Sequence, residues 1–89
     1  MRHALEDILR KGERLYLDRF KGELEKSSYG HYIVIDVDDE RYVVASTKLQ
    51  AITEAKERFG DRLFYTVQIG NLEHPTVNHR QSNLHAWNF

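Results

Sequence analysis

Apolar and polar positions alternate in three short runs between residues 30 and 70. The first run, residues 31–37, places three aliphatic side chains on one face of a strand: Ile33, Ile35 and Val37. An acidic turn at residues 38–40 leads into a second run, residues 41–46, and the short connection predicts an antiparallel hairpin. Because the turn contains no glycine, we expect a loop longer than two residues. The third run, residues 63–69, predicts another strand.

The segment between the second and third runs has the periodicity of a helix. Thr47 with Gln50 is a capping-box pattern, in which side chains satisfy free amides at the start of a helix. Gly60 ends the pattern, because glycine tolerates the left-handed conformation beyond a helix end. The predicted apolar stripe consists of Leu49, Ile52, Ala55 and Phe59.

A longer helical pattern covers residues 2–26. Its large apolar residues recur at steps of three and four: Leu5, Ile8, Leu9, Leu15, Tyr16, Phe20 and Leu24. Gly12 and Gly22 each cost about 1 kcal/mol relative to alanine in a helix interior. Gly12 lies on the apolar stripe, so it could allow close approach of another backbone, such as a second copy of the helix.

These elements predict an α+β fold with the order α-β-β-α-β in a single domain, residues 1–89. The first strand is the most continuously apolar, as expected of a central strand, so we predict a three-stranded antiparallel sheet in the order 2-1-3. Helix 47–59 crosses one face of this sheet. Tyr32 and Phe64 are out of phase with Ile33, and we expect the N-terminal helix, residues 1–27, to cover the face that they share.

The last nineteen residues, 71–89, differ in character from the ββαβ core at residues 30–70. They are rich in Asn and His, contain the only proline and show no sustained periodicity. We predict an irregular tail that packs back in part or docks on a partner.

Composition narrows the range of functions. The chain of 89 residues has no cysteine, which excludes disulfides and thiolate metal sites and favours a cytoplasmic location. Its 13 basic and 14 acidic residues nearly balance, which argues against nucleic-acid binding by bulk electrostatics. A local patch leaves a nucleic-acid-binding protein as an alternative; it would comprise Lys21, Lys26, Arg41, His79 and Arg80. No apolar run approaches the roughly 18 residues that span a bilayer, so we predict no membrane partner.

Two clusters in the sequence contain side chains that can ligate a metal ion. Glu73 with His74, His79 and His85 offers nitrogen and oxygen donors, but their spacing matches no zinc pattern, so weak metal binding by the tail is only an alternative. The acidic turn after Asp36 begins like a calcium loop. Arg41 and Thr47 stand where that loop requires glycine and glutamate, so a calcium loop is rejected.

Catalytic signatures are missing from the sequence. No serine stands in a G-x-S-x-G elbow, and Gly60 and Gly70 are single glycines that form no phosphate-binding loop. We therefore predict that the protein is not an enzyme and has no catalytic, cofactor-binding or metal-binding residues.

The pattern GHYIVIDVDDERYVV, two spaced alanines and RFGDRLFYTVQIG, at residues 30–70, resembles a family of small uncharacterised bacterial proteins. In its members, glycine usually stands in the hairpin turn and arginine before the closing Ile-Gly; here Asp39, Glu40 and Gln68 stand there. The resemblance implies the same arrangement of elements. It also implies one partner of a two-gene module, antitoxin-like or regulatory, and carries over no catalytic residue.

The sequence thus predicts a small non-enzymatic module that binds another protein. The outer strands of the predicted sheet present unpaired backbone groups, and their sequences lack the charges that normally protect an edge. A small core without disulfides also favours self-association as a dimer. The predicted partner-binding residues are Tyr42, Val44, Tyr65, Trp87 and Phe89.

Overall fold

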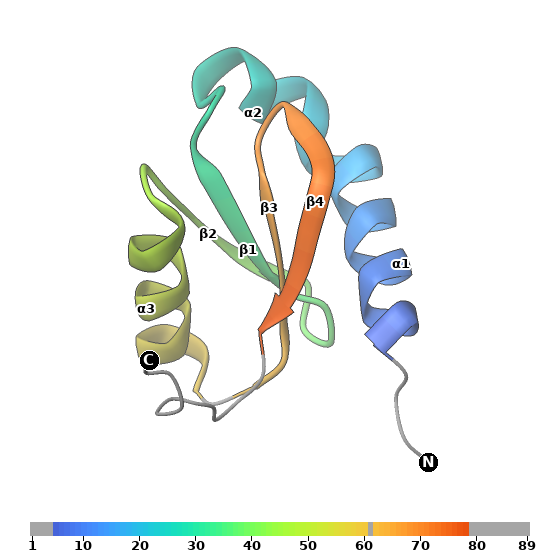
Figure 1. Cartoon of the computed structure of the whole chain (residues 1–89), viewed down its shortest axis with the longest axis vertical. Coiled ribbons are helices and arrows are strands. Elements are labelled where there is room, and N and C mark those ends of the chain that lie inside the picture. The colour runs from blue at the N-terminus through green and yellow to red at the C-terminus, as the bar shows by residue number, and fades with distance from the viewer. Residues whose placement is uncertain (1–4, 61, 79–89) are drawn as a thin grey trace.

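A computed structural model describes residues 5–60 and 62–78 of the chain. The elements in chain order are α1 (Leu5–Leu15), a π-helical turn η1 (Tyr16–Phe20), α2 (Lys21–Ser27), β1 (Tyr32–Asp36), β2 (Arg41–Ala45), α3 (Lys48–Phe59), β3 (Phe64–Gln68) and β4 (Asn71–Asn78). Figure 1 shows α1 on one side of the sheet and α3 on the other. The strands are antiparallel in the order β2-β1-β3-β4. The α+β class and the order 2-1-3 are therefore confirmed, but the sheet has a fourth strand.

The fourth strand corrects the prediction of an irregular tail from residue 71. Thr66 of β3 pairs with Thr76 of β4, and Gln68 pairs with Asn71. Between these pairs β3 has one residue, Val67, whereas β4 has residues 72–75, so the register shifts at a bulge. The bulge breaks the alternation by which a strand is recognised, and Pro75 falls within it, where a missing amide does not interrupt the pairing. Residues 79–89 lie outside the described residues.

The β1–β2 loop is longer than two residues, as predicted, because Asp36 pairs with Arg41 and residues 37–40 lie between them. Its backbone turns tightly: the Glu40 amide donates to the Asp36 carbonyl at 2.7 Å. Glu40 adopts a left-handed conformation with φ of 59°. A glycine-free turn is thus possible because only one residue of the loop takes a positive φ among those described.

The face of the sheet towards α1 carries the larger core. Side chains of β1, of β3 and of the residue after each strand meet the apolar stripe of α1 and η1 there: Ile33, Ile35, Val37, Tyr65, Val67 and Ile69 face Ile8, Leu15, Tyr16 and Phe20. This corrects the expectation that the first helix covers the face of Tyr32 and Phe64. The physical reason is the fit of Gly12 on Tyr65, since a Cβ at Gly12 would overlap the tyrosine ring. Gly12 therefore admits a side chain of the same chain and not a second helix.

The π-helical turn η1 keeps the buried side chains of the first helical segment directed at the sheet. Apolar or small residues recur every four positions along the buried side: Ile8, Gly12, Tyr16, Phe20 and Leu24. In an α-helix of 3.6 residues per turn, each step of four overshoots a full turn by about 40°. The wider turn at η1, closed by the Lys21 amide on the Tyr16 carbonyl, winds less per residue and keeps the stripe on the sheet.

The opposite face is closed by α3. Two alanines of α3 let the helix lie close to the sheet, where it packs on Val34, Val43 and Phe64. The predicted start is confirmed, because Thr47 accepts a hydrogen bond from the Gln50 amide at 3.1 Å. The predicted stripe was wrong at Leu49, which is 74% exposed, since the buried positions are Ala51 and Ala55 with Ile52 and Phe59 beside them.

Candidate functional site

Strand β2 forms one edge of the sheet and carries two of the predicted partner-binding residues. Tyr42 and Val44 both point to the α1 side, as their pairing with Ile35 and Ile33 requires. Tyr42 is 44% exposed, and its ring lies 4.6 Å from that of Phe20, centroid to centroid. Val44 is partly buried against the core on that side. These two side chains therefore combine an anchored position with an accessible surface.

Of the other predicted partner-binding residues, the structure describes only Tyr65, which does not lie at this edge. Tyr65 was expected on an outer strand, but β4 covers β3, and the Tyr65 side chain is fully buried against Gly12. Burial raises its pKa to about 12, and its hydroxyl has no hydrogen-bond partner within the described residues. The prediction for Tyr65 was therefore wrong. Trp87 and Phe89 lie outside the described residues.

The two edges of the sheet differ in regularity. Strand β2 pairs with β1 without interruption from Arg41 to Ala45. The opposite edge, β4, contains the register shift and Pro75. Bulges and prolines disfavour pairing with a further strand, so β4 is protected in the way natural edge strands usually are. A regular edge such as β2 offers its outward amides and carbonyls for pairing.

An open groove of about 750 Å³ runs beside β2 on the side of α3. Its lining comes from the end of β2 and the outer surface of α3: Ala45, Ser46, Leu49, Gln50, Thr53, Glu54, Glu57 and Arg58. Most of the Leu49 side chain is exposed on this surface. The sequence pattern missed the groove because it placed Leu49 in the buried stripe. Exposed apolar surface therefore flanks β2 on both faces of the sheet, with Tyr42 on one and Leu49 on the other.

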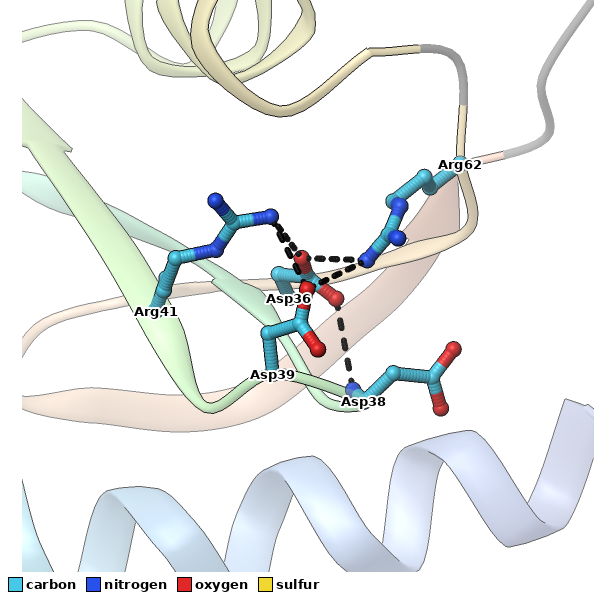
Figure 2. A network of polar contacts seen from close by, with 5 residues as sticks. All are labelled: Asp36, Asp38, Asp39, Arg41 and Arg62. Atoms are coloured by element: carbon cyan, nitrogen blue, oxygen red, sulfur yellow. Dashed lines mark hydrogen bonds and ion pairs between the residues drawn. The ribbon is translucent and has the colours of Figure 1, made fainter.

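The acidic residues of the β1–β2 hairpin form an ion-pair network with two arginines (Figure 2). Asp36 is buried at the end of β1, and its Oδ2 accepts from Arg41 at 3.0 Å and from Arg62 at 2.8 Å. Both guanidiniums also bind Oδ2 of Asp39, at 3.1 and 3.0 Å. The negative charge of Asp36 raises the pKa of Arg62. The network holds the segment after α3 against the hairpin, as the sticks in Figure 2 show.

The role of this network is structural, because it links the hairpin to the segment after α3. The Arg41 guanidinium lies 4.3 Å above the ring of Phe59 on α3, so it joins the network to the helix as well. Two carboxylates already matched by two guanidiniums offer little attraction to a further cation. Within residues 5–60 and 62–78, no three His, Asp or Glu side chains are grouped so as to hold a metal ion. For the alternative tail site, Glu73 lies exposed on β4, and His79 and His85 fall beyond the described part of the chain.

The residues of the alternative nucleic-acid patch do not gather on one described surface. Lys21 pairs with Glu25 at 3.1 Å within the first helix, and Arg41 is engaged in the ion-pair network. Lys26 is exposed on α2. His79 and Arg80 lie outside the described residues. As for membranes, no described helix is both long and apolar enough to cross one.

No protein family, curated protein or solved structure matches this chain in the three comparisons made. The resemblance of residues 30–70 to small uncharacterised bacterial proteins therefore stays a prediction. Among residues 5–60 and 62–78, no element pairs with the outer side of β2, and this edge with its two exposed apolar flanks is the candidate functional site.

Proposed function

We propose that this protein is a non-enzymatic binding module that takes up an extended strand of a protein along β2. The observation that carries the proposal is the combination of an uninterrupted edge strand with exposed apolar side chains on both of its faces. Addition of a strand to a sheet edge is a recurrent mode of peptide recognition, in which main-chain hydrogen bonds give affinity. Alternate side chains of the added strand supply the specificity.

The two faces of the edge would read different side chains. A strand beside β2 would place every second side chain next to Tyr42 and Val44 on the α1 side. The side chains between them would enter the groove under Leu49. We therefore propose that the bound strand is apolar on its Tyr42 side, and small or polar where it meets the groove, whose lining includes Gln50 and Glu54.

This proposal extends to the setting of the protein. The absence of cysteine predicts that the module works in a reducing cytoplasm. The resemblance at residues 30–70 predicts that its partner is the product of a neighbouring gene, in an antitoxin-like or regulatory pair. The cytoplasmic location and the neighbouring-gene partner are both predictions from the sequence. Identification of the bound protein would test the neighbouring-gene partner.

Site-specific photocrosslinking in the native cell tests the edge. A photoreactive phenylalanine at Tyr42 should give a discrete crosslinked protein, identified by mass spectrometry. The same amino acid at Leu17, which is 45% exposed on the outer side of the first helix, is the matched control and should give none. Loss of the Tyr42 product, or an equal product from Leu17, would remove the proposal.

A pair of lysine substitutions separates the two edges. Val44 on β2 and Val77 on β4 are both partly buried against the same core, so Val44→Lys and Val77→Lys make comparable changes at opposite edges. We expect the crosslink at Tyr42 to disappear in Val44→Lys, because a charged residue on an edge strand disfavours pairing. It should persist in Val77→Lys. Circular dichroism of both variants shows whether each remains folded.

A further inference from the structure

We infer that the edge β2 accepts a second copy of this chain, giving a two-fold symmetric dimer whose axis passes beside Val43. This inference rests on the proposed function and names one occupant of the same edge. It follows from three features that point to a single register: the pairing of β2 with itself, the position of α3 above β2, and the distribution of charge on the outer side of α3.

The first feature is the symmetry of β2 as a strand. Residues directly opposite in an antiparallel pair point to the same face of the sheet. A two-fold axis perpendicular to the sheet must therefore lie midway between two copies of the same residue, so that this residue pairs with itself. An axis at Val43, the middle of Arg41–Ala45, pairs the whole strand with its copy. It sets Tyr42 opposite Val44 of the second copy, an aromatic and β-branched pair of the kind that stabilises sheets.

The second feature is the alignment of α3 with β2. The helix starts just beyond Ala45 and runs back until the ring of Phe59 meets the guanidinium of Arg41. Its length of 12 residues, at 1.5 Å each, is about 18 Å. The five residues of β2 span about 17 Å. The middle of α3, near Thr53, therefore lies above the middle of β2, and one axis can serve both layers.

The distance between the two helices also fits. Helix α3 packs chiefly on β1 and β2, so its axis lies roughly between these strands. Strands in a sheet are about 4.8 Å apart, which places two α3 helices about 10 Å apart across a β2–β2 junction. Packed helices are separated by about 8–10 Å. The groove beside β2 is thus the space that a second α3 would close.

The third feature is the charge pattern on the outer side of α3. Around an axis between Thr53 and Glu54, at the midpoint of Lys48–Phe59, an antiparallel copy brings Glu57 next to Gln50 of the second copy. It brings Arg58 next to Leu49 of the second copy, where the aliphatic stem of the arginine can cover the leucine. A parallel arrangement would instead set Glu54 and Glu57 against themselves. Glu57 therefore favours the antiparallel register, the one that the strands require. Glu54 lies beside the axis, where its ion pair with Arg58 at 2.8 Å offsets its charge.

Cysteine crosslinking tests this register, because the chain has no cysteine of its own. Only a residue close to the two-fold axis meets its own copy. A short bis-maleimide should therefore join Thr53→Cys into covalent dimers at least about tenfold faster than Leu17→Cys, through the raised local concentration. Both positions are exposed, so neither substitution should disturb the fold. Equal rates for the two variants would overturn the inference.

A mixture of two variants tests the antiparallel direction. Gln50→Cys and Glu57→Cys, mixed after purification, should crosslink to each other faster than either does to itself. Faster crosslinking of Glu57→Cys to itself would contradict the register. The molar mass of the protein gives an independent measurement. Light scattering after size exclusion should give twice the 10.5 kDa of the chain for the unmodified protein, and 10.5 kDa for Val44→Lys.

The outcomes separate this inference from the proposed function. A mass of 10.5 kDa throughout a dilution series, with a Tyr42 crosslink to a different protein, would remove the second copy and leave the binding module. A Tyr42 crosslink to a second copy of this chain supports the dimer and strand addition at β2, and it removes the product of a neighbouring gene as the occupant of this edge. A protein that is monomeric and gives no Tyr42 crosslink loses both proposals.

Discussion

The two faces of the sheet are closed by different means. On the α1 side, large side chains interlock, and the helix touches the sheet so closely that Gly12 leaves room only for the ring of Tyr65. On the α3 side, Ala51 and Ala55 form the contact, and the ion-pair network around Asp36 closes one end. The first face is a fitted core with no space for another chain. The second places a helix that contacts the sheet through alanines beside the edge strand β2.

The difference shows how a chain of this size separates stability from binding. A small domain buries only about 60% of its unfolded surface, so a tight fit on one face matters to the whole fold. Helix α3 contributes less apolar bulk, and its outer side remains accessible next to β2. Changes on the α1 side should therefore act on stability. Changes on the outer side of α3 should act on association.

The largest expected effect is on the fitted face. Gly12→Ala should lower the free energy of unfolding by about 3 kcal/mol, because the added methyl group overlaps the Tyr65 ring and forces helix and sheet apart. Gly22→Ala, in α2 with no neighbouring atom within contact distance, should raise it by up to about 1 kcal/mol. Urea denaturation of both variants measures the contrast. Equal effects would mean that the fit at Gly12 does not determine stability.

The next effect concerns the ion-pair network around Asp36. Asp36→Ala should cost about 2 kcal/mol, less than a fully buried ion pair, because Arg41 and Arg62 keep partial access to water when the carboxylate is lost. Asp39→Ala removes a half-exposed carboxylate from the same two arginines and should cost less. Urea midpoints of the two variants decide the order. A larger loss for Asp39→Ala would contradict the central position of Asp36.

Two hydroxyl groups on the fitted face should respond in opposite directions. The Tyr16 hydroxyl donates to Glu25 at 2.9 Å and accepts from the Gly70 amide at 3.2 Å, so Tyr16→Phe should cost about 1 kcal/mol. The Tyr65 hydroxyl is buried without a partner in the described structure, so Tyr65→Phe should be neutral or stabilising by up to about 1 kcal/mol. Thermal unfolding of the two variants gives the comparison directly. Destabilisation by Tyr65→Phe would show that its hydroxyl has a partner.

The titration of these same tyrosines has no effect at neutral pH and appears only above about pH 10. Burial raises the pKa of both Tyr16 and Tyr65 from 10.0 to about 12, and the hydrogen bond to Glu25 adds to the shift at Tyr16. The folded chain therefore keeps these protons when the unfolded chain loses them, so stability is complete below pH 10 and falls as the pH rises towards 12. Urea midpoints between pH 8 and 12 should show a shallower fall in Tyr65→Phe. An unchanged slope would mean that Tyr65 does not contribute.

The regular parts of the fold could be predicted from the sequence because their signals are local. Alternation fixed β1 and β3, and Thr47 with Gly60 fixed the ends of α3. Strand β4 could not be predicted in this way, because its bulge interrupts the alternation and Pro75 counts against a strand. The steps of four along the first helix did contain the signal for η1, since a period of four exceeds that of an α-helix.

The candidate site was predicted in part. Tyr42 and Val44 follow from the edge position of the second strand, but Tyr65 was misplaced because its exposure depended on whether a fourth strand covered β3. The partners of Asp36 also depend on tertiary structure. Arg62 lies 26 residues away in sequence, and no local pattern connects the two. Face assignment failed for the same reason, since the contact of Gly12 with Tyr65 is visible only after folding.

The division of the sheet into two hairpins also has a consequence in time. Strands β1 and β2 are joined by a short loop, as are β3 and β4, so each pair can form within microseconds. The central pairing of β1 with β3 joins residues as distant as Tyr32 and Gln68, and α3 must cross over before it can close. Such non-local pairing carries the entropic cost of loop closure and slows folding. The pairing of β1 with β3 should therefore limit the rate of folding. The ion pair of Asp36 with Arg62, at the end of this pairing, forms only after the two hairpins have associated.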